Sequence, residues 1–95
     1  MKFEWDETKN KKNIEKHGID FNDAITIFDD DEKIEAIDTR NNYGEERLQV
    51  IGEAKPGIIM VAYTWRHNNT TRRMISARTA SRNERALYNS LKGTE

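Results

Sequence analysis

The spacing of apolar side chains changes along this chain, and each change predicts a new element. A short stretch at 2–5 is typical of a first strand. Within 21–28 the apolar positions recur three and four residues apart, which predicts an amphipathic helix that begins at Asp20 or Asn22. The positions of this stripe are Phe21, Ala24, Ile25 and Phe28.

A meander of strands is predicted next. The run at 58–65 is the longest unbroken apolar stretch, so we expect it to be the central strand, covered on both faces. Turn residues at 41–44, 55–57 and 68–69 separate it from its neighbours. The predicted strands cover residues 34–39, 47–53, 58–65 and 72–78.

The last strand and the final helix have distinct patterns. In the strand we expect Arg73, Ile75 and Ala77 on one face, alternating with their neighbours on the other. The helix opens with Ser81 and Glu84, which are spaced as a capping box. Its core face is expected to hold Leu87, Tyr88 and Leu91, with part of Glu84.

This order of elements predicts the fold class. It is an α+β domain with a four- to five-stranded, mainly antiparallel sheet, two N-terminal helices and one C-terminal helix. A chain of 95 residues is short enough to form one domain, which we expect to span 1–95.

The stretch 6–18 predicts a helix with almost no apolar side. Asp6 is a good N-cap and Gly18 a good C′ residue, while Ile14 is the one clearly apolar residue between them. A short helix usually needs an apolar stripe in order to dock. Here a polar, basic stripe points instead toward an anionic partner. Its members are Lys9, Asn13, Lys16 and His17.

Composition narrows the class of protein. The chain has no cysteine, so a disulfide framework and a thiolate metal site are excluded. No apolar run approaches the roughly 18 residues of a membrane span, and the N-terminus lacks a secretion signal. The two histidines lie far apart in sequence. We therefore expect a cytoplasmic protein with no metal, no cofactor and no membrane contact.

Charge is unevenly distributed although the formal net charge is only −1. Residues 20–38 are strongly acidic, and the chain from Arg66 onward is strongly basic. This asymmetry suggests an anion-binding surface and an acidic surface for a basic partner. Two solvated faces of opposite sign explain it equally well.

The residue types suit phosphodiester chemistry without a metal. RNA supplies its own nucleophile, the 2′-OH, so the protein needs groups that move protons and cations that stabilise charge. His17 at a helix end is suited to carry a proton, and arginines bind phosphate through two N–H groups. Tyr43, Tyr63 and Trp65 could stack bases.

Each of these residues also has a plainer explanation. His17 can simply end its helix, and Arg73 and Arg78 can form structural ion pairs across the sheet. Trp65 can belong to the core. From pattern alone, the chain is a small α+β domain that binds RNA or another anion.

Three segments in the same order resemble the BrnT family of toxins. They are FEWDETKNKKNIEKHGIDFNDA at 3–24, Glu46-Arg47 followed by Ile51-Gly52, and RRMISARTASRNERALY at 72–88. Met74 stands where that family tends to have isoleucine, a change that conserves volume. The resemblance implies a RelE-like fold and the toxin of a type II toxin–antitoxin system, an endoribonuclease that cleaves RNA and inhibits translation.

The resemblance also implies partners. They are an RNA substrate, a cognate ribbon-helix-helix antitoxin similar to BrnA that neutralises the toxin, and operator DNA reached indirectly through the antitoxin. The alternative is a non-catalytic RNA- or antitoxin-binding module that acts in operon autoregulation.

The candidate site combines the resemblance with the residue types. We expect His17 to transfer protons and Lys9 to position RNA or stabilise charge, with Glu46 as a base or as the partner of an arginine. Phosphate is expected to contact Arg47, Arg73 and Arg78. The expected RNA-binding residues are Lys12, Asn13, Lys16, Arg66, Arg72 and Tyr63.

Overall fold

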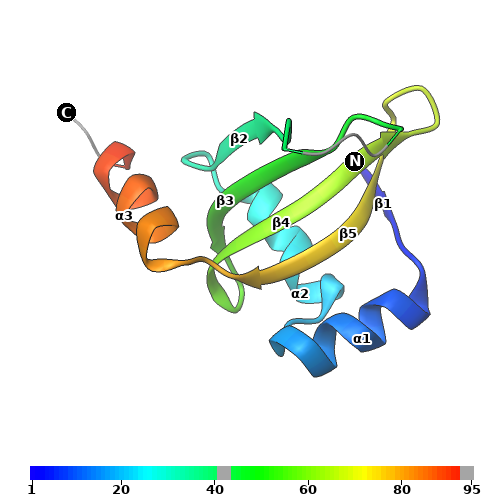
Figure 1. The fold of residues 1–95 in the computed structure, drawn as a ribbon, viewed down its shortest axis with the longest axis horizontal. Helices are drawn as coiled ribbons and strands as arrows, with labels where there is room; N and C mark the ends of the chain where they lie inside the picture. The colour runs from blue at the N-terminus through cyan, green and yellow to red at the C-terminus, as the bar shows by residue number, and fades with distance from the viewer. Residues whose placement is uncertain (41–43, 93–95) are drawn as a thin grey trace.

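The computed structural model describes residues 1–40 and 44–92 (Figure 1). Its strands are β1 (Lys2–Glu4), β2 (Ile34–Ile37), β3 (Leu48–Ala54), β4 (Gly57–Arg66) and β5 (Thr71–Thr79). Its helices are α1 (Glu7–His17), α2 (Phe21–Ala24), the 3₁₀ helix η1 (Ile25–Asp29) and α3 (Arg82–Leu91). The predicted α+β class is confirmed. Tyr43 and most of the predicted turn at 41–44 lie outside the described residues.

The five strands form one mixed sheet in the order β1-β5-β4-β3-β2. Neighbouring strands are antiparallel except β1, which runs parallel to β5. The apolar run at 58–65 does form the central strand, since β4 has a partner on each side. The predicted, mainly antiparallel sheet is therefore confirmed, with one parallel pair that the sequence pattern did not reveal.

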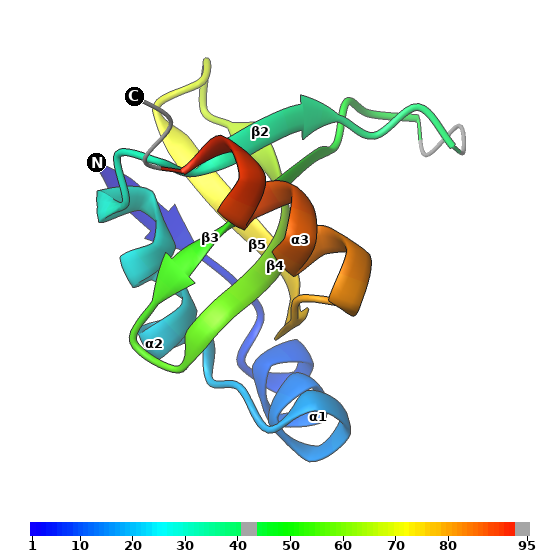
Figure 2. The same cartoon turned by 90° about the vertical axis from the view of Figure 1, so that its left-hand side faces the viewer.

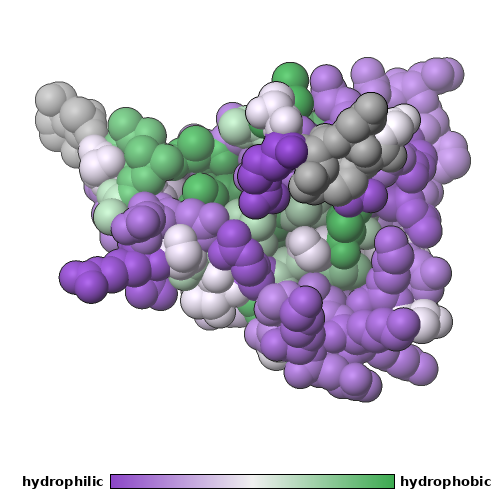
Figure 3. Space-filling model, viewed as in Figure 1, coloured by the Kyte–Doolittle hydropathy of each residue, from purple (hydrophilic) through white to green (hydrophobic). Residues whose placement is uncertain are grey.

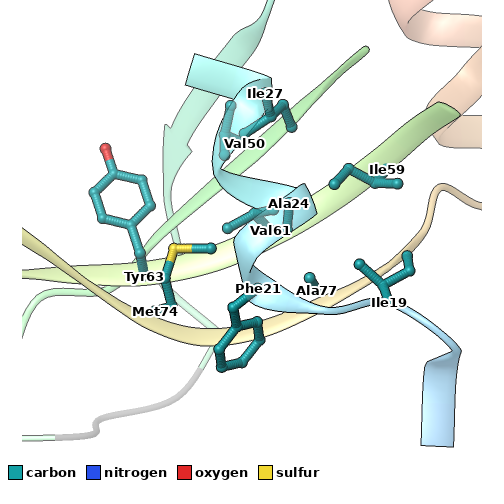
Figure 4. Packing of buried hydrophobic residues seen from close by; sticks show 10 residues of the cluster. All are labelled: Ile19, Phe21, Ala24, Ile27, Val50, Ile59, Val61, Tyr63, Met74 and Ala77. Atoms are coloured by element: carbon teal, nitrogen blue, oxygen red, sulfur yellow. The ribbon is translucent and has the colours of Figure 1, made fainter. Parts of the chain in front are cut away.

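The hydrophobic core lies on one face of this sheet, under α2 and η1 (Figures 1 and 2). Figure 4 shows its side chains meeting between that helical segment and the strands β3, β4 and β5. Val50, Val61 and Met74 are essentially inaccessible to solvent. Burying a side chain of this size stabilises the fold by about 1.5–3 kcal/mol, so this layer supplies most of the hydrophobic stabilisation.

The helix predicted at 21–28 is a short α-helix that continues as a 3₁₀ helix. Phe21, Ala24 and Ile27 are each fully buried, whereas Ile25 and Phe28 are only half-buried. Because a 3₁₀ helix has three residues per turn, residues three apart share one face. The predicted stripe is thus confirmed: Phe21 and Ala24 are fully buried, and Ile25 and Phe28 pack against the core from its edge, whereas the pattern missed the buried Ile27.

A β-bulge changes the alternation in β5. Ala62 pairs with Ser76 and Tyr63 pairs with Met74, so Ile75 has no opposite residue. An extra residue in one strand reverses which face the following side chains occupy. Ala77 is consequently in the core, and its predicted place on the same face as Arg73 is wrong.

Helix α1 begins and ends as the sequence predicts. The Asp6 carboxylate accepts a hydrogen bond from the Thr8 N–H at 2.8 Å. Gly18 has a φ of 72°, a left-handed conformation that costs glycine little. Its N–H donates to the Ile14 carbonyl at 2.7 Å. The ends of α1 are therefore set locally, independently of its packing.

Two buried asparagines dock α1. The Asn13 amide donates to the Ala77 and Ile19 carbonyls at 2.9 Å each and accepts from the Ala77 N–H at 3.1 Å. It completes the free edge of β5 where β1 has already ended. Asn10 accepts from the Phe21 N–H at 2.9 Å and so ties α1 to α2.

Helix α3 is anchored mainly by one side chain. The predicted capping box between Ser81 and Glu84 is present, but Leu87 and Leu91 are 47% and 55% exposed, so their predicted core positions are wrong. Tyr88 is buried and donates to Asp30 at 2.6 Å. Burial and the Asp30 carboxylate raise the pKa of Tyr88 to about 12.

An ion pair joins α3 to β5. The Arg78 guanidinium donates to both oxygens of Glu84, at 2.7 and 2.9 Å. These hydrogen bonds lower the pKa of Glu84 to about 2, against its usual 4.5. Within residues 1–40 and 44–92, no helix is long and apolar enough to cross a membrane.

We predict that Asn13→Ala lowers the free energy of unfolding by about 3 kcal/mol, because it leaves buried backbone groups of Ala77 and Ile19 without partners. Urea denaturation measures the change. Lys11→Ala, at an exposed position of the same helix, should change stability by less than about 0.5 kcal/mol. Equal stabilities for the two variants would show that the asparagine does not dock α1.

The Arg78–Glu84 pair predicts a pH dependence of stability. Since the pKa of Glu84 is lower in the folded state than in the unfolded state, the pair stabilises fully above about pH 4.5 and loses this effect as the pH falls toward about 2. Glu84→Gln keeps the capping box and removes the charge. The variant should be about 1–2 kcal/mol less stable at pH 7, allowing for partial exposure, with the difference shrinking in acid. A difference that is the same at pH 7 and pH 3 would contradict this.

Candidate nucleic-acid interface

No helix of the described residues crosses the centre of the sheet face opposite α2, although Met60 and Thr64 of β4 are buried on it (Figure 1). Figure 1 looks onto this face, with α1 along one side and α3 at one end. We call it the open face. Figure 3 shows hydrophilic side chains over α1 and more apolar ones over α3. By strand register, the side chains that point to the open face include Gln49, Ala62, Thr64, Arg66, Arg73, Ser76 and Arg78.

A row of cations borders the open face. Lys9, Lys12 and Lys16 are exposed on α1, and His17 is half-buried at its end. We call these four residues the basic ridge. They line a cavity of about 250 Å³ together with Asn13, Ile75 and Ser76. The bulge in β5 therefore lies directly beside the ridge.

Three arginines on the open face are each held by a carboxylate. Arg66 contacts Glu45 at 3.0 Å, Arg73 contacts Glu4 at 3.0 Å, and Arg78 has its two bonds to Glu84. Each arginine side chain keeps about a third of its surface exposed. A guanidinium has five N–H donors, so one carboxylate partner leaves donors for a phosphate.

The segment before β3 lies against the same face. The Glu46 carbonyl accepts a hydrogen bond from the Thr64 hydroxyl at 2.6 Å. Arg47 contacts Glu45 at 3.4 Å, so Glu45 bridges Arg47 and Arg66. The structure thus brings Glu46, Arg47 and Arg66 together near one end of the open face, away from the basic ridge.

Arg72 and Tyr63 point to the opposite face. The Arg72 guanidinium lies 4.2 Å from the Phe28 ring centre and 4.6 Å from that of Trp65, and its Nε has no partner among the described residues. Tyr63 is buried and donates to Glu35. Burial and Glu35 raise the pKa of Tyr63 to about 12.

Three of the residues expected to bind RNA support the fold. Arg72 and Tyr63 lie on the core face, and both amide N–H groups of Asn13 donate to backbone carbonyls. Their contacts with RNA stay predictions. Residue type suggested a ligand role, whereas the pleat of the strand and the docking of α1 decide where each side chain points.

One cluster escaped the sequence reasoning. His67 Nε2 lies 2.9 Å from Glu4 Oε1, and the other Glu4 oxygen accepts from Arg73. These hydrogen bonds, the one from His67 foremost, lower the pKa of Glu4. The two partners are 63 residues apart in sequence, so no local motif could have linked them.

In the part of the chain that the structure describes, no three His, Asp or Glu side chains are grouped so that they could hold a metal ion. The carboxylates that ion pairs place on the open face, Glu4, Glu45 and Glu84, are instead paired with arginines and His67.

Comparison with known proteins gives a family. Residues 5–84 match the family described as the ribonuclease toxin BrnT of type II toxin–antitoxin systems. No curated protein matches the chain. The matched stretch contains α1, the strands β2–β5 and the capping box of α3, and hence the whole basic ridge and the three arginines of the open face. The chain belongs to the BrnT family of ribonuclease toxins of type II toxin–antitoxin systems.

Proposed function

We propose that this protein is a metal-independent endoribonuclease that binds RNA across the open face, and that its cleavage of cytoplasmic RNA inhibits translation. A ribbon-helix-helix antitoxin similar to BrnA would neutralise it and connect it to operator DNA. The observation that carries the proposal is the basic ridge of α1 beside the open face with its three arginines.

The ridge suits the backbone of a single strand. Lys9 and Lys16 are seven residues apart, about 10 Å along the helix axis, with Lys12 between them. A row of this length can contact more than one phosphate. The cavity beside it reaches Ser76 on the sheet, so a strand bound to the ridge also meets the open face.

The arginines suit the chemistry of the phosphate. When the 2′-oxygen attacks phosphorus, negative charge develops on the phosphoryl oxygens, and fixed guanidinium groups stabilise that charge. Arg73 and Arg78 are held in place by Glu4 and Glu84. Positioning of this kind supplies much of the rate enhancement when the substrate carries its own nucleophile.

A catalytic role for Lys9 stays a prediction, whereas for His17 we propose RNA binding. His17 lies beside Ser76 at the end of the ridge, where it can contact bound RNA. Across residues 1–40 and 44–92, no carboxylate or carbonyl is hydrogen-bonded to its ring. A proton-transfer imidazole is commonly fixed by such a partner, so we assign His17 to RNA binding.

A second candidate function has one observation in its favour. Every open-face arginine named above is already paired with a carboxylate, which is also what a purely structural or binding surface would show. The protein would then be a non-catalytic RNA- or antitoxin-binding module. Cleavage of RNA by the purified protein separates the two functions.

We predict that the purified protein cleaves a mixed-sequence single-stranded RNA in the presence of EDTA, because the 2′-OH and protein cations suffice. The products should carry a 2′,3′-cyclic phosphate and a 5′-hydroxyl. The same sequence made of DNA serves as the control and should remain intact. RNA that binds and is never cut would favour the binding module.

We also predict that replacing Lys9, Lys12 and Lys16 together by alanine weakens RNA binding strongly. Each phosphate contact contributes about 0.7 to the slope of log affinity against log salt, so the slope should fall by about 2. Filter binding at several salt concentrations measures it. Lys11→Ala, on the same helix but outside the cavity, should leave the slope nearly unchanged, and an equal loss in both proteins would disprove a specific ridge.

A further inference from the structure

Glu4, His67 and Arg73 form a cluster at one end of the open face. Glu4 and Arg73 are direct neighbours in the pairing of β1 with β5, so both side chains point to that face. Glu4 accepts from Arg73 at 3.0 Å and lies 2.9 Å from His67 Nε2. One carboxylate therefore holds an imidazole and a guanidinium side by side.

The turn that carries His67 has an unusual backbone. His67, Asn68 and Asn69 have φ values of 55°, 57° and 64° in succession. Asn and His tolerate this left-handed region better than most residues, yet it remains uncommon outside glycine. The turn is closed by Thr70, whose hydroxyl donates to the His67 carbonyl at 2.7 Å. Backbone held in such regions is concentrated at functional sites.

The His67 ring has the surroundings of a proton-transfer group. A carboxylate on one ring nitrogen fixes the orientation of the ring and leaves the second nitrogen for a substrate. The side chain is 63% exposed, so a ligand can reach it. Lys2, Glu4, His67 and Thr70 help to line a cavity of about 420 Å³.

We propose that His67 is the catalytic proton-transfer residue of RNA cleavage, that Glu4 is its positioning residue and that Arg73 binds the scissile phosphate. This inference rests on the proposed ribonuclease activity. The 2′-OH gives its proton to His67 while its oxygen forms a bond to phosphorus. The bond from phosphorus to the 5′-oxygen breaks, the leaving oxygen takes a proton from water, and His67 returns its proton to the solvent.

The position of His17 is consistent with this assignment. His17 lies beside Ser76, whereas His67 lies next to Thr71 at the start of β5. Five residues that include the β-bulge separate those positions by roughly 13–17 Å of strand, so the two imidazoles belong to different parts of the open face. When RNA extends from the ridge to Arg73, His17 would contact the strand several ångströms from the phosphate that is cleaved.

The test compares His67→Ala, His67→Gln and His17→Ala in single-turnover cleavage of a labelled mixed-sequence RNA. Affinity is measured separately with the 2′-O-methyl form of that RNA, which cannot be cleaved. Both His67 variants should lower the rate at saturating protein by about 100-fold or more with unchanged affinity. Added imidazole should restore part of the rate to His67→Ala. His17→Ala should act on the affinity.

Two further variants sharpen the test. Glu4→Gln should slow cleavage by about 10-fold or more and displace the limb of the pH–rate profile that reports the imidazole. Asn68→Gly lies in the same turn, makes none of the proposed contacts and should cleave at the wild-type rate. Thermal unfolding of each variant establishes that it is folded.

The possible failures are distinguishable. If the wild-type protein cleaves RNA and His67→Gln cleaves equally fast, His67 has only a hydrogen-bonding role and the inference is wrong, while the ribonuclease proposal stands. If His17→Ala lowers the cleavage rate at saturating protein and His67→Ala does not, His17 of the ridge is the proton-transfer residue and the inference is wrong. If the wild-type protein cuts no RNA, both proposals fall together.

Discussion

The hydrogen bonds between the Asn13 amide and the backbone of Ala77 fix the relation of α1 to the sheet. They replace the apolar stripe that normally docks a helix of this length, and they act at the one part of β5 that β1 leaves unpaired. The RNA-binding role proposed for the basic ridge depends on this contact, because it holds the ridge beside Ser76. A helix docked through an amide has a defined register, since a shift of one residue would remove both hydrogen bonds to Ala77.

The second constraint is the pleat of β5, which divides neighbouring arginines between two environments. Arg72 is buried between Phe28 and Trp65, whereas Arg73 is directed to the open face beside Glu4. Contacts with these aromatic rings offset part of the hydration that the buried arginine loses. Carboxylate partners hold the exposed arginines in fixed orientations. A surface that is nearly neutral in total can therefore still present oriented cations to phosphate, with the carboxylates acting as supports.

Much of the fold could be predicted because it is set locally. The caps of α1, the capping box of α3 and the central apolar strand each depend on residues within a few positions of one another. The predictions were wrong where a contact between residues far apart in sequence decides the structure. The bulge at Ile75 reversed the faces of β5, and the short docking contact of α3 left Leu87 and Leu91 exposed. The same limit applies to the site, since the approach of Glu4 to His67 is created by the pairing of β1 with β5.

The absence of an apolar stripe on α1 also has a functional consequence. An apolar face wide enough to dock a helix covers at least about 100° of its circumference. Docking through Asn10 and Asn13, which are three residues apart, uses a narrower face and leaves positions 9, 12 and 16 for cations directly beside the contact. Such docking demands that every buried amide group find its partner, because an unsatisfied one is costly. The helix can therefore bring its lysines close to the sheet only while its asparagines remain fully bonded, which couples the integrity of the fold to the shape of the RNA-binding surface.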